Sequence, residues 1–361
     1  MNGSVPGIRF DDAGLCSYCA DFLRSWEPGK SALRSDPESN IDALVNRVKA
    51  AGRSKPYDCV VGVSGGVDSS WVLVNTVRLG LRPLAVHMDN GWNSELAQNN
   101  IANLVRGLGV DLYTHVIDWE EYRGLMQAFF DADVIDIELL YDNAMLAVNY
   151  QQASRHRLGW IFAGTNTATE GMKMPPGWNW NKFDSTNIRS ISHKHGGPSL
   201  RTFPSIGTLS RHWYKVIRQI RWISFLDYIP YNKLEAVREL QKCFGYKPYP
   251  YKHYESVFTR FYQGYILPRK FGVDKRLLHL STLVADGQLL REEALADLLN
   301  SPYPSQADLD SDRAYFLKKM GWTDAQLREF IARPSRPHTD YRTEFRALRH
   351  AREIWHQLLG S

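Results

Sequence analysis

The feature that most constrains this chain is the glycine-rich hexapeptide Ser64-Gly65-Gly66-Val67-Asp68-Ser69. Before it, residues 57–63 form an apolar, β-branched run of strand length, which suits a strand buried on both faces. After it, residues 69–79 follow a helical pattern that ends at Gly80. The hexapeptide is therefore predicted to be the turn that joins a central strand to the next helix.

Such a turn is suited to binding phosphate. Gly65 and Gly66 can take backbone angles that side chains forbid, and they let phosphate oxygens reach the main chain. The start of the helix offers unpaired N–H groups and the positive end of its dipole. The polar side chains that complete the site are the hydroxyls of Ser64, Ser69 and Ser70 and the carboxylate of Asp68, which can hold Mg²⁺. The alternative is a tight strand-to-helix turn capped by its serines.

Two common nucleotide-binding motifs are excluded. No lysine follows the glycines, as the motif G-x-x-x-x-G-K-[ST] requires. The stretch Gly62-Val63-Ser64-Gly65 also lacks the spacing of G-x-G-x-x-G. A phosphate loop here must belong to another class.

The pattern of elements predicts an α/β fold. Further strands are expected at residues 83–87, 111–116 and 159–163. Helices are expected between them, at 41–51, 95–108, 119–130 and 138–156. Strands that alternate with helices predict a parallel sheet with helices on both faces.

The second half of the chain has a different character. Residues 175–204 are polar and loop-like, and helices are expected after them at 210–226, 232–244, 291–299 and 342–359. We therefore expect an irregular N-terminal segment (1–38), a sheet domain (39–205) and a C-terminal helical extension for substrate or partner (206–361).

The hexapeptide resembles the signature of the PP-loop ATP pyrophosphatases, which include GMP, NAD and asparagine synthetases and several tRNA-modifying enzymes. The resemblance implies that the loop grips the pyrophosphate of ATP while a substrate oxygen attacks the α-phosphorus. It also implies nucleotide contacts at two later strand ends. The implied ATP-binding set is Ser64, Gly65, Gly66, Val67, Ser69, Ser70, His87, Asp89, Gly164, Thr165 and Asn166.

A narrower resemblance, to the N-acetyl sugar amidotransferases of surface-polysaccharide (LPS O-antigen type) biosynthesis, covers most of the chain. Besides the hexapeptide, it rests on residues 10–19, 163–170, 252–263, 270–276 and 279–281. It implies that ATP adenylates the N-acetyl oxygen of a nucleotide sugar. Nitrogen from ammonia then replaces this oxygen, giving an acetamidino sugar, AMP and pyrophosphate. The resemblance also implies partner subunits similar to the glutaminase and cyclase of histidine biosynthesis.

Several charged residues are candidates for the chemistry. Asp68 is expected to hold Mg²⁺. Lys275 and Arg276 are candidates for further contacts to phosphates, with Arg260 as a second choice; a surface charge is the alternative for each. Glu255 is a candidate acid–base group, and an ion pair between Glu255 and Arg260 is the alternative to that role.

The four cysteines do not form a disulfide scaffold. Cys16 and Cys19 have the spacing of a metal knuckle, but one such pair is half a zinc site. The second pair that similar proteins often carry before it is not in this sequence, so Zn²⁺ is left open. Asn2 and the mid-strand Cys59 do not fit a glutaminase nucleophile. Ammonia is thus expected from solution or from a partner.

Charge and hydropathy set the remaining expectations. The net charge of +5 fits anionic substrates without requiring nucleic acid. No apolar run of about 18 residues and no signal-peptide pattern is present, so we expect a cytoplasmic protein without a membrane partner. A tRNA-modifying enzyme of the thiolase or lysidine type is the alternative function. The sequence has no basic block or RNA-binding module to favour it.

Overall fold

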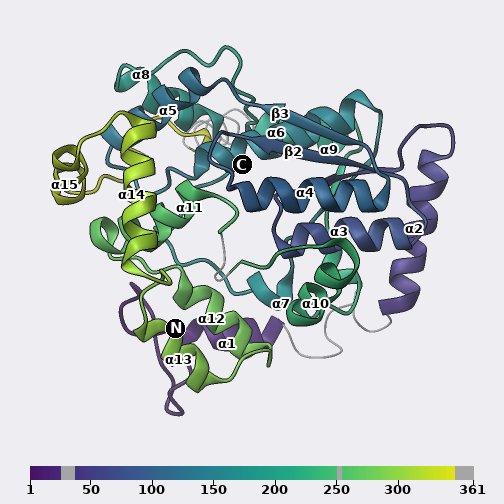
Figure 1. Cartoon of the computed structure of the whole chain (residues 1–361), viewed down its shortest axis with the longest axis horizontal. Helices are drawn as coiled ribbons and strands as arrows, with labels where there is room; N and C mark the ends of the chain where they lie inside the picture. The colour runs from purple at the N-terminus through teal and green to yellow at the C-terminus, as the bar shows by residue number, and fades with distance from the viewer. Residues whose placement is uncertain (26–36, 250–253, 346–361) are drawn as a thin grey trace, which may run out of the picture.

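A computed structural model of the chain describes residues 1–25, 37–249 and 254–345 (Figure 1). At its centre is a parallel sheet of five strands in the order β3-β2-β1-β4-β5. The strands are β1 (Cys59–Gly62), β2 (Pro83–Asp89), β3 (Leu112–Val116), β4 (Trp160–Ala163) and β5 (Arg221–Ser224). The first four confirm the predicted strands.

The fifth strand corrects the prediction of one helix over residues 210–226. Helix α9 (Thr208–Val216) ends early, and Gln219 turns the chain with a positive φ of 54°. Residues 221–224 then pair with β4, from Trp160↔Arg221 to Ala163↔Ser224. A strand this short gives no period that distinguishes it from a helix end. The sheet thus continues beyond residue 205, where the sheet domain was expected to end.

Helices cover both faces of the sheet, as predicted. Side chains alternate along β1, so that Val60 points into one core while Cys59 and Val61 point into the other. The first core is covered by α5 (Trp119–Asp131) and α6 (Leu139–Arg155). The second is covered by α2 (Pro37–Gly52), α3 (Val67–Arg78) and α4 (Glu95–Leu108).

The C-terminal region is helical, and it extends the first core. Phe258, Phe316 and Phe330 pack around Phe130 of α5, whose ring centre lies 5.0 Å from that of Phe330. The elements of this region are η1 (Phe225–Tyr228), α10 (Lys233–Phe244), α11 (Val257–Phe261), the π-helix η2 (Tyr262–Phe271), α12 (Arg276–Ala285), α13 (Arg291–Leu299), α14 (Gln306–Met320), α15 (Asp324–Ala332) and η3 (His338–Asp340). The region therefore shares both cores with the sheet: α11, η2, α14 and α15 join the first, and η1 and α10 join the second.

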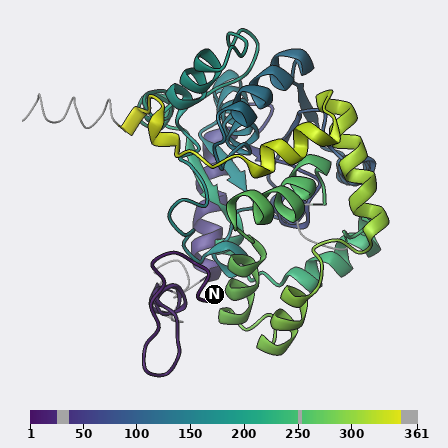
Figure 2. The same cartoon turned by 90° about the vertical axis from the view of Figure 1, so that its left-hand side faces the viewer.

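Three short helices complete the fold. Helix α1 (Ser17–Ser25) packs on α12, and Figure 2 shows the N-terminal segment beside these C-terminal helices. Helix α7 (Thr167–Glu170) follows β4. Helix α8 (Ser185–Lys194), capped by Asp184, lies in the stretch predicted to be loop. Most of the helix predicted at 342–359 falls outside the described residues. Among those that are described, no helix has the length and apolar character needed to cross a membrane.

A buried histidine fastens the last described turn to the body of the protein. The ring of His338 stacks on Trp180 with centres 4.9 Å apart, and its Nδ1 lies 2.7 Å from Oδ1 of Asn187. Burial lowers the pKa of His338 to about 4. The folded protein therefore holds this imidazole neutral under conditions in which the unfolded chain protonates it.

This depressed pKa predicts a loss of stability in mild acid. Below the unfolded pKa of about 6.5, the unfolded chain binds a proton that the folded chain excludes. The contribution of His338 to the free energy of unfolding should fall by about 2 kcal/mol between pH 6.5 and 5. Urea unfolding of the wild type and of His338→Gln at both pH values isolates this contribution. If the free energy of unfolding changed equally between the two pH values in both proteins, the prediction would be contradicted.

Candidate functional site

The predicted phosphate loop lies between β1 and α3, at the carboxyl edge of the sheet. Gly65 has a φ of 84°, a conformation that favours glycine. A Cβ on Gly65 would lie 2.9 Å from the carbonyl oxygen of Ala97 in α4, so this close approach also requires glycine. The hydroxyls of Ser64 and Ser69 lie 3.1 Å apart, and the N–H of Gly66 donates to Ser64 Oγ at 3.2 Å. The loop is thus a compact turn lined by hydroxyl groups.

The first turn of α3 is suited to receive an anion. Its N-cap residue is Gly66, which has no side chain to cap the first N–H groups of the helix. On the other side, a Cβ on Gly164 would lie 2.7 Å from the nitrogen of Ser69. Gly164, the first of the predicted residues after β4, therefore lies directly against the loop. Together with the positive helix end, this backbone cradle fits a pyrophosphate group.

Residues from the end of β2 support the loop from behind. His87 is buried, its Nδ1 donates to the carbonyl of Val63 at 2.8 Å, and its Nε2 accepts from Asn93 at 3.0 Å. Burial lowers the pKa of His87, opposed by the hydrogen bond that its Nδ1 donates to the carbonyl of Val63 and by the charge of Asp89. A neutral imidazole in one tautomer therefore ties β2 to the residue before Ser64. The predicted contact of His87 with nucleotide stays a prediction.

The other residues after β4 have structural partners. Oδ1 of Asn166 accepts from the N–H of Thr169 at 2.8 Å and caps α7. The hydroxyl of Thr165 lies 3.0 Å from that of Ser224, at the end of β5. Gly164 is thus the member of this trio that touches the loop through its backbone, and the side chain of Asn166 stabilises a helix start.

Three tyrosines from the C-terminal half close over the loop, and the sequence analysis missed them. Tyr231 donates to the carboxylate of Asp68, while Tyr246 and Tyr249 donate to the carbonyl of Gly65 at 3.2 and 3.0 Å. Burial raises the pKa of all three phenols, so they remain protonated donors. A signal that could have found Tyr246 and Tyr249 is the Tyr- and Pro-rich stretch at residues 246–251, which interrupts a helical region; Tyr231 has no such signal.

A second carboxylate, that of Glu255, lies at the loop. Its Oε1 is 3.8 Å from the position that a Cβ on Gly66 would take, and its carbonyl accepts from the N–H of Ser94 at 2.9 Å. After burial, the charge of Glu255 contributes to raising the pKa of Tyr141 and Tyr249. Two carboxylates beside a phosphate site repel a bare polyphosphate, and a divalent cation between them offsets this. Asp68 and Glu255 therefore fit Mg²⁺.

The predicted cationic residues are each paired with a carboxylate. Lys275 Nζ lies 2.6 Å from Oε2 of Glu138, at the start of α6, and Arg276 pairs with Asp274 at 2.8 Å. Arg260 makes a two-pronged ion pair with Asp312, which also accepts from Tyr303. The partner of Arg260 is thus Asp312, where Glu255 was the expected alternative. Contacts of these three cations to phosphate stay predictions.

The cysteine pair does not support zinc. Cys16 and Cys19 have their sulfur atoms 3.1 Å apart, and burial raises the pKa of Cys19 to about 11. Across residues 1–25, 37–249 and 254–345, no group of three or more His, Cys, Asp or Glu side chains is placed to hold a metal ion. Mg²⁺ needs no such group, because it takes most of its ligands from substrate phosphates and water.

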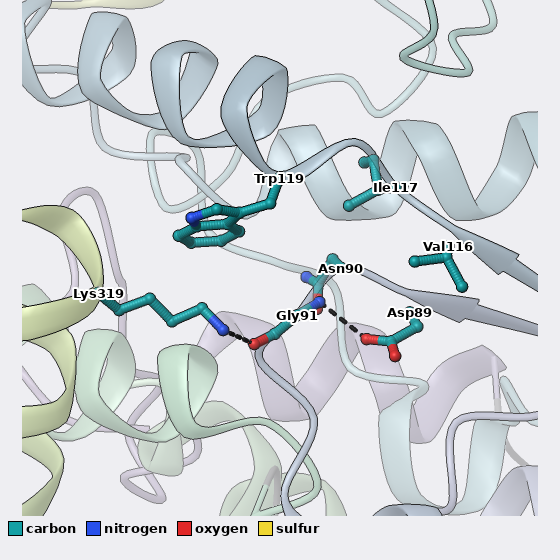
Figure 3. A pocket seen from close by; sticks show the side chains of 7 residues that line it. All are labelled: Asp89, Asn90, Gly91, Val116, Ile117, Trp119 and Lys319. Atoms are coloured by element: carbon teal, nitrogen blue, oxygen red, sulfur yellow. Dashed lines mark hydrogen bonds between the residues drawn. The ribbon is translucent and has the colours of Figure 1, made fainter.

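A pocket of about 190 Å³ opens at the carboxyl ends of β2 and β3 (Figure 3). From α14, Lys319 reaches across to donate to the carbonyl of Gly91, with its Nζ 4.5 Å from the ring centre of Trp119. Asp89 Oδ1 accepts from the N–H of Gly91 at 2.8 Å and from Asn93 at 3.2 Å. The lining residues are Asp89, Asn90, Gly91, Val116, Ile117, Trp119 and Lys319. The pocket thus combines an aromatic face, a carboxylate, an amide and a cation.

The pocket and the phosphate loop are connected. Asn93 donates to both Asp89 and His87, and His87 in turn holds Val63, the residue before the loop. The predicted residue Asp89 therefore faces the pocket while its neighbours support the loop. Trp119 and Lys319 were not predicted, because they join the site from segments far along the chain.

Comparison with known proteins adds a family to this geometry. Residues 255–352 match the family described as "LPS biosynthesis protein WbpG-like, C-terminal domain". A GMP synthase (glutamine-hydrolyzing) of Pyrobaculum aerophilum is 33% identical over 111 residues, which make up 30% of this chain. The matched stretch covers 20% of the length of that curated relative.

Solved structures give weaker likenesses. The NMN synthetase of Francisella tularensis is 15% identical and matches 61% of this chain and 99% of its own. The NH3-dependent NAD synthetase of Campylobacter jejuni is 12% identical and matches 60% of this chain and 100% of its own. Both have a TM-score of 0.30, which is too low to carry an argument.

One residue, Glu255, belongs both to the family match and to the candidate site. The match to the WbpG-like domain begins at Glu255, and this carboxylate lies beside Gly66 of the loop. The match confirms the resemblance to surface-polysaccharide biosynthesis proteins that the motifs predicted. The chain thus combines the hexapeptide at residues 64–69, which resembles the PP-loop signature, with a C-terminal region that matches the WbpG-like LPS biosynthesis domain.

Proposed function

We propose that this protein is an ATP-dependent amidotransferase that converts the N-acetyl group of a nucleotide sugar into an acetamidino group. The observation that carries the proposal is the contact between its two parts. Glu255, the first residue of the WbpG-like domain, lies at the phosphate loop of the sheet domain. This contact supports a single site in which ATP and a polysaccharide precursor react.

The chemistry requires activation of an amide, which is a poor electrophile. The amide oxygen attacks the α-phosphorus of ATP, and pyrophosphate leaves. Ammonia then adds to the imidate carbon, and AMP leaves with the former amide oxygen. The N–H groups at the start of α3 and the hydroxyls of Ser64 and Ser69 are placed to stabilise the charge on departing pyrophosphate. When bound, Mg²⁺ would be held by Asp68 and Glu255 and would neutralise phosphate charge.

The pocket beside Trp119 is suited to the sugar. An indole face packs against the apolar face of a pyranose ring, while Asp89 and Asn90 offer hydrogen bonds to hydroxyls. Lys319 adds a cation for a phosphate of the nucleotide carrier. Val86 pairs with Gly62, and Asp89 lies three residues further, so the pocket begins about 10 Å beyond the end of β1. This spacing suits a sugar whose acetamido arm extends towards the α-phosphorus.

The nitrogen donor is proposed to be ammonia. Cys59 is fully buried, and burial raises its pKa well above the ordinary value, so its thiol is unsuited to attack glutamine. The raised pKa of Cys19 argues against that thiol in the same way. Ammonia would come from solution or from a partner subunit similar to the glutaminase and cyclase of histidine biosynthesis.

The function is tested by a direct conversion assay. The purified protein, incubated with ATP, Mg²⁺, ammonium and a panel of UDP-acetamido sugars, should release AMP and pyrophosphate. Mass spectrometry should find one sugar lighter by the difference between oxygen and NH. Replacing ammonium with glutamine should abolish the product. AMP release without any lighter sugar, but with modification of tRNA, would establish the alternative adenylating enzyme instead.

The role of Asp68 is tested by Asp68→Asn. Loss of one carboxylate charge from the Mg²⁺ and pyrophosphate site should lower turnover by at least about a hundredfold. The fold should persist, because Tyr231 can still donate to the amide oxygen. Asp111→Asn is the matched control, since Asp111 accepts from Tyr57 at 2.7 Å in another Asp–Tyr pair, just before β3. Steady-state pyrophosphate release measures both variants, and equal turnover in them would refute the role.

The role of the pocket is tested by Trp119→Ala. Loss of the stacking face should raise KM for the sugar about tenfold or more, and leave KM for ATP within about twofold. Trp213→Ala, at an exposed tryptophan on α9, is the control. A rise in KM for ATP with no change for the sugar would reassign the pocket to the nucleotide.

A further inference from the structure

Helix α9 presents an apolar stripe to solvent. Leu209 is 76% exposed, Trp213 45%, Val216 44% and Ile217 65%. These residues follow the spacing i, i+4, i+7, i+8, which places them on one face of a helix. Every residue of α9 is at least partly exposed. The stripe therefore contributes little to the hydrophobic core of the chain, and such surfaces on proteins mark interaction sites.

The segment of the sequence that contains the stripe is basic. Residues 185–226 contain no Asp or Glu, and their Lys and Arg residues are Arg189, Lys194, Arg201, Arg211, Lys215, Arg218 and Arg221. These seven charges exceed the net charge of +5 of the whole chain. Lys215 is exposed on α9, and the guanidinium of Arg218 lies 5.7 Å from the ring centre of Trp213. Cations thus lie beside the apolar side chains.

Neighbouring elements add to this charge. Arg218 donates to the carbonyl of Ser154 at 3.0 Å, which brings the end of α6 and its exposed Arg155 and Arg157 beside α9. At the other end, the carboxylate of Glu344 accepts from the N–H of Thr208 at 2.5 Å and from the hydroxyl of Ser185. This carboxylate is bound to the helix start, so it leaves the cationic face around Lys215 intact.

The apolar and basic side chains on and around α9 indicate what kind of partner this surface binds. Nucleic acid would use the cations but has no counterpart for an aliphatic stripe of Leu209, Val216 and Ile217. Protein interfaces are enriched in tryptophan and arginine, but they are depleted of lysine and of charge at their core, and Lys215 is exposed on this helix. A bilayer with anionic lipids matches both properties, because apolar side chains enter the acyl boundary while cations meet the headgroups. Tryptophan is enriched at that boundary.

We propose that α9 docks the protein on the surface of a membrane rich in anionic phospholipid. The helix would lie in the interface, with Leu209, Trp213 and Ile217 inserted and Lys215 and Arg218 at headgroup level. This departs from the expectation of no membrane partner, which rested on the lack of a continuous apolar run. A search for a continuous apolar run does not detect a helix on which apolar and basic residues alternate. The proposal rests on α9 alone and is independent of the reaction at the phosphate loop.

Vesicle sedimentation of the full chain tests the proposal. Wild type should bind phosphatidylcholine vesicles containing about a third phosphatidylglycerol, and bind pure phosphatidylcholine at least about tenfold more weakly. Binding should weaken as salt screens the charges. Leu209→Ser/Ile217→Ser should reduce binding about tenfold or more. Lys215→Glu should reduce it about fivefold or more.

The matched control is Leu295→Ser/Leu299→Ser on α13, where the side chains are 45% and 89% exposed. This variant should bind vesicles as the wild type does, and melting curves should show all variants folded. Absence of wild-type binding to the anionic vesicles at low salt would overturn the proposal. Equal vesicle binding by Leu209→Ser/Ile217→Ser and by Leu295→Ser/Leu299→Ser would also overturn it. Self-association of the wild type that is lost in Leu209→Ser/Ile217→Ser, without vesicle binding, would assign the stripe to a second copy of the chain.

Discussion

The close approach of two backbones, at Gly164 and at the first turn of α3, is the constraint on which the site depends. A methyl group on Gly164 would come within 2.7 Å of the nitrogen of Ser69. A methyl group on Gly65 would likewise come within 2.9 Å of the carbonyl oxygen of Ala97 in α4. The loop is therefore enclosed by β4 and α4, and its shape is fixed before any ligand arrives. A preformed cradle of N–H groups needs no reorganisation when charge develops on a phosphate.

The C-terminal region completes this enclosure. Its packing in the shared core fixes the positions of the side chains that it contributes to the site. The aromatic residues of α11, α14 and α15 pack against Phe130 in the same core that covers one face of the sheet. Rigid packing of this kind fixes where Glu255 and Lys319 reach the carboxyl edge. The site thus belongs to neither half of the chain, and the pocket beside Trp119 exists because α14 is held against α5.

Whether a feature of the fold or of the site was predictable depends on how far apart in the sequence its interacting residues lie. Four strands and the turn between β1 and α3 were predicted, since their signals are local: apolar runs, helical spacing and paired glycines. Strand β5 has four residues, too few to establish a period. The tyrosines that contact Asp68 and Gly65 come from 163 to 184 residues away, and nothing in the local pattern records such contacts. Arg260 and Lys275 looked like phosphate ligands because their carboxylate partners lie 52 and 137 residues away.

The hydrogen bonds of Tyr246 and Tyr249 to Gly65 have a consequence for how such a protein changes during evolution. The turn between β1 and α3 and the two hydroxyls that clamp it come from segments about half the chain apart, and both hydroxyls donate to a single carbonyl oxygen. Recombination that exchanged one segment without the other would leave a turn without its clamps. The turn and its clamps therefore depend on each other, whereas substitutions at the pocket rim, such as Trp119 or Lys319, leave both hydrogen bonds to Gly65 in place.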